Sequence, residues 1–372
     1  MSSDETLSRR AYLALAGGGL SALAGCSSAG GNQDGSTTTR PTDTATPTAT
    51  ATATRSPTPA AEDPETPTPT QEPSASITRM ESELASVEFD GEYVDTHAHW
   101  LPSMGPEMPS KYAPMMEKYD IGATVLFSPS ADAVQRYESF LERLTDPGVE
   151  YLPFMSAPPP GQQLSAELRA LYDGKEKAFW GIGEWKPQNE PFPAFNGDRY
   201  TPMWELAADL DIPVMFHPKA SQEGTVEPAL DTYAETTFIL HGHQMLGYGQ
   251  EGPGLGPTLP RLLREYDNLY WQMDVGVMFS GILLRLRSSS EFVDWYESNA
   301  GELVDIYQDI LPQLLEAAPE RIMWGTDIAQ HWNLNDEAFS LLMEFTEKVL
   351  EAVPEKHRVP YKRENALRLF DL

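Results

Sequence analysis

The chain has 372 residues, a length that suits one large domain with appendages. Its formal net charge is −30, and the segment 81–372 alone carries 48 acidic against 21 basic residues. This excess of negative charge disfavours binding to DNA or RNA, because phosphate contacts need the opposite sign. The single cysteine, Cys26, excludes an intrachain disulfide and a cysteine-based zinc site, so a metal would need histidine and carboxylate ligands.

The first 80 residues are expected to lie outside the folded domain. In residues 1–25, the pair Arg9 and Arg10 precedes an apolar stretch too short to span a bilayer, and the segment resembles a twin-arginine signal peptide. It ends in Leu-Ala-Gly before Cys26, which resembles a lipobox whose cysteine becomes lipidated. We therefore expect an extracytoplasmic protein attached to the cell-surface membrane through Cys26; the alternative is an inert leader with a chance cysteine.

Residues 26–80 are dominated by Thr, Pro and Ala and contain too few apolar groups to form a core, so they are expected to be a disordered linker. With only nine lysines and a strong acidic excess, the composition resembles that of proteins from salt-loving archaea. The alternative is an acidic protein from an ordinary habitat.

From residue 81 onward, short apolar runs alternate with longer amphipathic runs. Eight runs are predicted to be strands: 92–98, 123–128, 149–155, 178–184, 212–217, 237–241, 268–275 and 321–327. The clearest helical stretches between them are 131–144, 165–172, 201–210, 259–266, 304–318 and 336–353.

This alternation predicts a (β/α)8 TIM barrel over residues 81–372, since eight strand–helix units fit the number and the size of that fold. A doubly wound open sheet is the main competitor. That fold usually carries a glycine-rich phosphate loop after its first strand, where this chain has THAHW instead.

Ionisable side chains follow the predicted strands. In a barrel, active-site residues come from the C-terminal ends of strands. Five of the eight predicted strands end in such residues: His97 and His99, Glu184, His217, His241 and Asp327. Because successive strand residues alternate in direction, the spacing of two places Asp95, His97 and His99 on one face. Each signal alone has an ordinary structural explanation, but four imidazoles and two carboxylates at strand ends indicate a metal site.

At these residues the chain resembles the amidohydrolase superfamily, in the branch that also contains metal-dependent decarboxylases. The matching stretches are VDTHAHW, GIGEW, IPVMFHP, FILHGH, RIMWGTD and ENALRLF. The resemblance implies His97, His99 and His217 as metal ligands with Asp327 as carboxylate partner. His241 matches the sixth-strand histidine that assists catalysis or holds a second metal, although His243 is an alternative for that position. Glu184 stands where some members carry a bridging carbamylated lysine, so it would bridge two metals or stand near a single one.

The ligand types favour Zn²⁺, with Mn²⁺ as the alternative, and leave open whether one or two ions bind. A divalent ion lowers the pKa of bound water from about 16 towards 7 and so supplies hydroxide near neutral pH. Our hypothesis is that Asp327 takes the proton from this water while His241 steadies the oxyanion formed at a carbonyl.

Other residues near these positions each have two alternative roles or are further candidates. Asp95 would orient His97 or make an ordinary buried hydrogen bond. Trp100 and Trp185, with two further tryptophans beside the site residues (Trp324 and Trp332), would form an aromatic wall for substrate or pack between barrel and helices. His331 follows Asp327 closely and is a further candidate for contact with substrate.

The leading functional prediction is a metal-dependent hydrolase that cleaves an amide, ester or lactone of a small molecule. A non-hydrolytic decarboxylase on the same barrel is the first alternative, and a lipid-anchored solute-binding protein with two similar lobes is the second. Substrate specificity is expected to lie in loops after the strands, at 100–110, at 185–200 and in the long stretch after the seventh strand.

Overall fold

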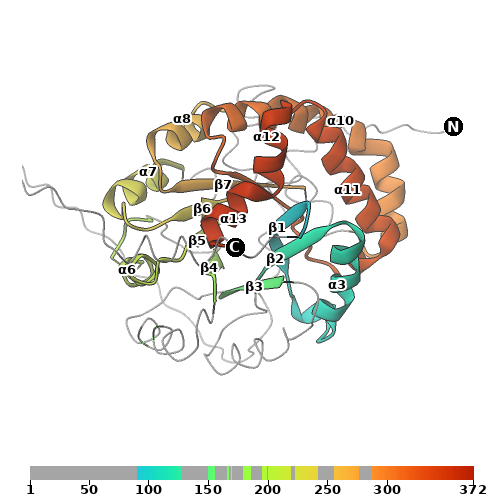
Figure 1. Cartoon of the computed structure of the whole chain (residues 1–372), viewed down its shortest axis with the longest axis horizontal. Coiled ribbons are helices and arrows are strands. Elements are labelled where there is room, and N and C mark those ends of the chain that lie inside the picture. The colour runs from blue at the N-terminus through green and yellow to red at the C-terminus, as the bar shows by residue number, and fades with distance from the viewer. Residues whose placement is uncertain are drawn as a thin grey trace, which may run out of the picture. The chain divides into compact units, whose positions relative to one another are not determined.

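The computed structural model describes residues 90–127, 150–155, 166, 169, 179–185, 195–198, 200–218, 223–241, 255–275 and 286–372. They build one sheet of eight parallel strands that neighbour each other in chain order (Figure 1). The strands are β1 (Tyr93–His99), β2 (Ile121–Phe127), β3 (Glu150–Met155), β4 (Gly181–Trp185), β5 (Val214–Phe216), β6 (Phe238–Leu240), β7 (Leu269–Asp274) and β8 (Ile322–Gly325). All eight predicted strands are present, and several are shorter than expected, most of all β5, β6 and β8.

The sheet closes on itself between β1 and the segment after β8. Ala98 forms a parallel bridge with Ile328, and the backbone N–H of His99 donates to the Ile328 carbonyl at 2.8 Å. The N–H of Asp327 donates to the carbonyl of His97, also at 2.8 Å. The predicted (β/α)8 TIM barrel is therefore confirmed, and the described strands form one barrel and not two lobes.

Helices surround the strands (Figure 1). They are α3 (Met108–Lys118), α6 (Thr201–Asp209), α7 (Glu223–Thr232), α8 (Thr258–Glu265), α10 (Ser289–Ala317), α11 (Asp336–Leu350), α12 (Glu355–Val359) and α13 (Asn365–Phe370), with short turns η3 (Pro102–Met104), η7 (His331–Leu334) and η8 (Pro360–Glu364). Predicted helices 201–210, 259–266 and 336–353 correspond closely to α6, α8 and α11. Among the described residues, no helix is both long and apolar enough to cross a membrane.

Two predictions of local structure were wrong. The segment 100–110 was expected to be a loop, but it contains η3 and the first turn of α3. A proline is tolerated in that first turn, because the backbone N–H groups there have no partner within the helix. The helix predicted over 304–318 begins much earlier, at Ser289, because Ser288 caps it by accepting from the N–H of Glu291. The predicted helix at 131–144, most of that at 165–172 and all of residues 1–80 lie outside the described residues.

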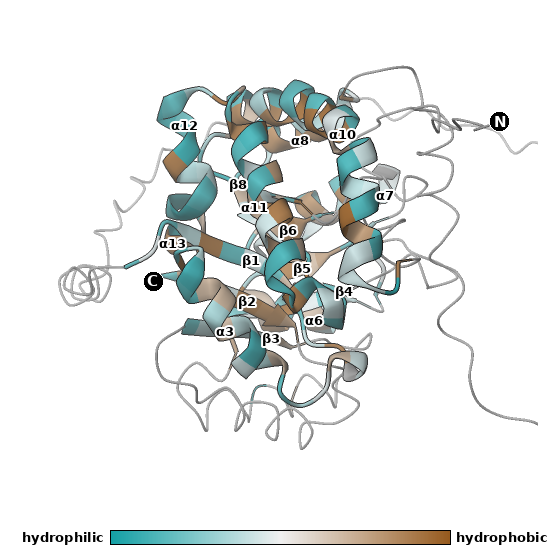
Figure 2. Ribbon diagram, turned by 90° about the vertical axis from the view of Figure 1, so that its right-hand side faces the viewer, coloured by the Kyte–Doolittle hydropathy of each residue, from teal (hydrophilic) through white to brown (hydrophobic). Residues whose placement is uncertain are grey.

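Side chains inside the barrel form a core separate from the layer between strands and helices. The inner cluster includes Val94, Val125, Phe154, Met215 and Met323, and α13 adds Ala366 and Phe370 to it. Figure 2 shows the apolar strands enclosed by helices whose outer faces are hydrophilic. The helix α13 thus closes one end of the barrel, and the ionisable strand ends occupy the other.

Candidate metal centre

A bulge in β1 directs its two histidines into the barrel. Asp95 pairs with Thr124 and Ala98 with Leu126, so a three-residue step in β1 opposes a two-residue step in β2. Val94, before the bulge, belongs to the inner cluster, and Ala98, after it, belongs to the outer one. Strict alternation from Val94 would point His97 and His99 out of the barrel. The extra residue in the bulge reverses the alternation of the side chains, so both histidines face the interior, as Val94 does.

The same bulge takes Asp95 to the opposite face, so its expected position beside the two imidazoles was wrong. Its carboxylate is fully buried and accepts hydrogen bonds from Tyr112 of α3 and from the N–H (2.8 Å) and hydroxyl (2.7 Å) of Thr326. It also accepts from the backbone N–H of His97 at 3.0 Å, but it does not bond the ring. Burial raises the pKa of Asp95 to about 6, against these hydrogen bonds, which lower it. Asp95 therefore ties β1 to the end of β8.

A second bulge turns Glu184 inward. Ile182 pairs with Val214 and Trp185 with Phe216, again three residues against two. Ile182 belongs to the outer cluster, and without the bulge Glu184 would face the same way. Gly183 adopts a φ of +140°, and a Cβ there would lie 2.4 Å from the carbonyl oxygen of Met215. Only glycine fits this close approach to β5.

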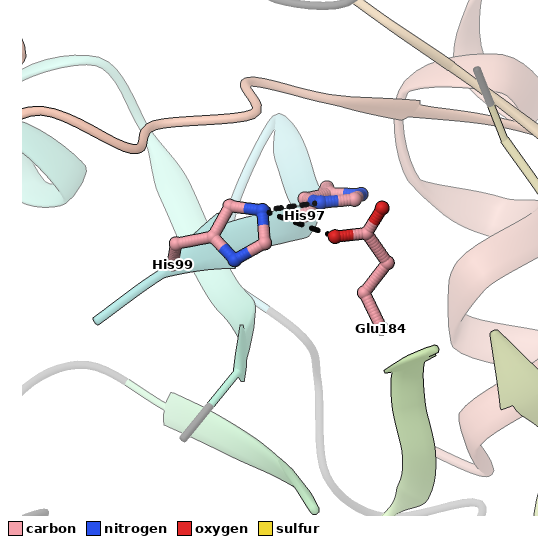
Figure 3. A group of neighbouring side chains, drawn as sticks. All are labelled: His97, His99 and Glu184. Atoms are coloured by element: carbon pink, nitrogen blue, oxygen red, sulfur yellow. Dashed lines mark hydrogen bonds and ion pairs between the residues drawn. The ribbon is translucent and has the colours of Figure 1, made fainter. Parts of the chain in front are cut away.

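One half of the centre joins β1 to β8 and β4. The Nε2 atoms of His97 and His99 lie 2.9 Å apart, and Asp327 Oδ1 lies 3.5 Å from the first and 3.3 Å from the second. His99 Nε2 is also 3.6 Å from Glu184 Oε2, and Figure 3 draws these side chains with His97. Asp327 adopts a φ of +52°, a left-handed conformation that Asp tolerates better than most residues.

The other half joins β4, β5 and β6. The remaining oxygen of Glu184, Oε1, lies 3.0 Å from His217 Nδ1 and contacts His241 Nε2. The two imidazoles lie edge to face, with ring centroids 4.4 Å apart. Glu184 thus reaches both halves, one carboxylate oxygen towards each.

Asp274, at the end of β7, is a member of the centre that the sequence analysis missed. It is fully buried, and its Oδ2 lies 3.3 Å from His241 Nδ1. The signal was present in the sequence, because Asp274 is the next-to-last residue of the predicted seventh strand, 268–275, close to its C-terminal end. Six of the eight predicted strands therefore carry an ionisable residue at or beside that end.

Charges within the cluster set its protonation. Burial, reinforced by the nearby charge of His241, holds the pKa of His97 well below its usual value, so this imidazole is neutral. Burial raises the pKa of Asp327, but the hydrogen bond with His99 and the nearby histidine side chains outweigh it and lower the pKa to about 2. For His241, burial lowers the pKa, but Glu184 and Asp274 outweigh it and raise the pKa to about 10.

The side chains fit a divalent metal. Three triads place one potential ligand atom from each residue within 4.8 Å of the others: His97, His99 and Glu184; His97, His241 and Asp274; and Glu184, His217 and His241. Two imidazole Nε2 atoms facing each other at 2.9 Å are compatible only with a proton between them or with a shared cation. A donor set of nitrogen and oxygen without sulfur suits Zn²⁺ or Mn²⁺.

The other candidate residues lie outside this cluster. Trp100 is buried, donates from Nε1 to the Gly105 carbonyl and packs in the outer layer. Trp324 also packs there, against Tyr93 and with Nε1 donating to Thr346, and Trp332 packs against Phe292, so these three do not form an aromatic wall. His331 is exposed on η7. His243 and the side chain of Trp185 lie outside the described residues.

Comparison with known proteins identifies the family and agrees with the fold. The family model described as amidohydrolase matches residues 94–372. No curated protein matches the chain. Among solved structures, a protein assigned as a 2-pyrone-4,6-dicarboxylic acid hydrolase from Pseudomonas putida is 17% identical, with a TM-score of 0.53 over 77% of this chain and 98% of that one.

An amidohydrolase from Burkholderia multivorans, solved with bound zinc, is 17% identical, with a TM-score of 0.51 over 75% of this chain and 99% of that one. At these identities the solved structures show a shared fold alone. The match of the family model is what decides membership, because it spans the barrel from β1 to the last residue. The chain belongs to the amidohydrolase family.

Proposed function

We propose that this barrel is a metal-dependent hydrolase that cleaves an amide, ester or lactone bond of a small organic substrate. The observation that carries the proposal is the position of Glu184, whose Oε2 faces His99 and whose Oε1 faces His217 and His241. This arrangement favours two ions, one held by His97, His99 and Asp327 and the other by His217 and His241, with Glu184 between them. The zinc bound in the Burkholderia multivorans amidohydrolase supports Zn²⁺ over Mn²⁺.

A bound divalent ion supplies hydroxide near neutral pH by lowering the pKa of water from about 16 towards 7. Asp327 is the residue placed to handle the proton. Its side chain is 13% exposed, more than that of any other acid or histidine in the cluster, and its low pKa keeps it ionised at neutral pH. It therefore accepts a proton from the attacking water and passes it to the leaving group.

His241 was expected either to assist catalysis or to hold a second metal, and its position favours the metal. Its side chain is 2% exposed and lies between Glu184 and Asp274, so it is better placed to hold an ion than to contact an oxyanion on the substrate. The oxyanion role remains an alternative, and the metal stoichiometry decides between them.

Elemental analysis of the purified full chain tests the proposal, followed by assays on lactones, esters, amides and aromatic carboxylic acids in high salt. We expect about two zinc ions per chain, hydrolysis with incorporation of ¹⁸O from labelled water, loss of activity with a chelator and recovery with Zn²⁺. Release of carbon dioxide without ¹⁸O incorporation would instead establish the decarboxylase. Activity that persists without metal would refute both.

We further propose that the barrel is held at the outer face of the cell membrane through a lipid on Cys26. This proposal rests on the twin-arginine and lipobox resemblance of residues 1–26 and on the Thr/Pro-rich composition of the linker. Cys26→Ser should release the protein from the membrane fraction into the medium, and replacing Arg9 and Arg10 with lysine should retain it inside the cell. A wild-type protein found only in the cytoplasm would contradict the proposal.

A further inference from the structure

Strand β7 carries two buried polar side chains two residues apart, Gln272 and Asp274. Both are fully buried, whereas Trp271 and Met273, which alternate with them, belong to the outer cluster. The two polar side chains therefore face the barrel interior from one strand, directly beside the metal centre.

Each of these side chains reaches the Nδ1 atom of a different histidine. Gln272 Oε1 lies 2.6 Å from Nδ1 of His97, and Asp274 Oδ2 lies 3.3 Å from Nδ1 of His241. The other ring nitrogen of each histidine points to the centre of the site. His97 Nε2 faces His99 and Asp327, and His241 Nε2 contacts Glu184.

An imidazole that donates its Nδ1–H to an oxygen presents the lone pair of Nε2 on the opposite side. We propose that Gln272 and Asp274 are positioning residues, which hold the Nδ1–H of His97 and of His241 and leave Nε2 of each ring directed at the metal; His241 gives up its Nε2 proton when the metal binds. This inference rests on the metal-dependent function proposed above. One acceptor is a neutral amide and the other a carboxylate, so β7 also makes His241 the more electron-rich ligand of the two.

The surroundings of Gln272 are arranged for this contact. A Cβ on Gly325 of β8 would lie 2.1 Å from Gln272 Nε2 and 3.1 Å from His97 Cβ, so only glycine there leaves room for the amide. Among the described residues, Gln272 Nε2 has no hydrogen-bond partner. A buried amide whose NH2 group has no partner lowers stability. The hydrogen bond between its oxygen and His97 Nδ1 is what this amide provides in return.

The test compares Gln272→Leu, which has similar size but no acceptor, with Gln272→Glu, which keeps an oxygen. A matched control is Asn365→Leu, which removes a buried amide that donates to the carbonyls of Pro319 and Ile322 at the opposite end of the barrel. Cobalt affinity of the full-length variants is measured by competition with a chelating dye. We expect Gln272→Leu to weaken Co²⁺ binding about 10- to 100-fold, Gln272→Glu to stay within a few-fold, and Asn365→Leu to lower Tm alone.

A second readout needs no metal. The ¹⁵N shifts of the histidine rings in the metal-free protein identify the protonated nitrogen of His97, which should be Nδ1 in the wild type and shift towards Nε2 in Gln272→Leu. If that variant fails to fold, Gly325→Ala displaces the same amide from the other side and should have the same effect.

For the second histidine, Asp274→Asn keeps an acceptor and should weaken Co²⁺ binding less than Asp274→Leu. Unchanged Co²⁺ affinity in Gln272→Leu, or a wild-type His97 protonated on Nε2, overturns the inference. A wild type that binds no Co²⁺ but carries the Nδ1 proton refutes the proposed function instead.

Discussion

The two ends of the barrel differ in the side chains that the same strands carry: ionisable groups at one end and apolar groups at the other. At the C-terminal end, four buried imidazoles and two buried carboxylates gather with the partly exposed carboxylate of Asp327. At the other end, α13 lays Phe370 against the inner cluster, and the amide of Asn365 donates to two backbone carbonyls. Burial of charge at the first end costs stability that apolar packing at the second end supplies. Substitutions at the polar end should therefore mainly change metal binding and activity, and substitutions at the apolar end should mainly change stability.

The largest effect is expected from His97→Ala at the polar end. It removes a neutral imidazole from the centre and should abolish both metal retention and activity while the protein stays folded. Metal content by elemental analysis and a circular dichroism melt measure the two quantities. His357→Ala, in α12, is the matched control and should change neither. A His97→Ala protein that keeps its metal and its turnover would remove the basis of the proposed centre.

Asp327→Asn should separate proton transfer from metal binding at the same end. The amide keeps the size of the side chain but cannot accept a proton, so kcat should fall about 10²- to 10⁴-fold. The metal should largely remain, because the histidines and Glu184 are intact. Steady-state kinetics with metal analysis on the same sample decide the point, and an unchanged kcat would show that Asp327 handles no proton.

Phe370→Ala tests the apolar end. The ring packs edge to face on Phe154, with centroids 5.8 Å apart, inside the barrel. Its removal should lower the free energy of unfolding by about 3–5 kcal/mol. The kcat of the protein that remains folded should be unchanged, as measured below the melting transition. A drop in kcat without a drop in Tm would mean that the two ends are coupled and not separate.

The sequence predicted the fold well because its signals are local and repeated. Eight apolar runs alternate with amphipathic ones, and this period is enough to specify the barrel and the strand ends where the candidate ligands lie. The spacing of His97 and His99 also predicted correctly that both face one side. Helix starts were harder to place, although Ser288 with Glu291 three residues later is a capping signal that would have located the start of α10.

The sequence could not predict what depends on irregular strand pairing. Regular alternation of side chains along a strand puts Asp95 on the same face as His97, and Glu184 on the same face as Ile182. A bulge in β1 reverses the first assignment, and a bulge in β4 reverses the second. Only Gly183 marks the second bulge in the sequence, and nothing local marks the first. Tertiary contacts such as that of Gln272 with His97, 175 positions apart, leave no local pattern either.

Asp95→Asn should have an intermediate effect on stability because Asp95 ties β1 to the end of β8. An amide offers one acceptor oxygen where the carboxylate offers two, so some donors from Thr326, Tyr112 and the His97 backbone lose their partner. The expected loss is about 1–3 kcal/mol, measured by urea unfolding of the metal-free protein. Asp95→Ala should cost more, and equal stability of Asp95→Asn and wild type would show that the closure does not depend on this carboxylate.

The smallest effect is expected from Trp324→Phe, which tests whether the aromatic residue beside Asp327 serves the substrate or the fold. Its indole N–H donates to Thr346 at 3.2 Å, and its ring packs against Tyr93 in the outer layer. Phenylalanine keeps most of the packing and loses the hydrogen bond, so stability should fall by about 0.5–1.5 kcal/mol. KM should stay the same, because the side chain points away from the metal centre. A changed KM at unchanged Tm would place Trp324 in the substrate pocket and contradict its assignment to the layer between strands and helices.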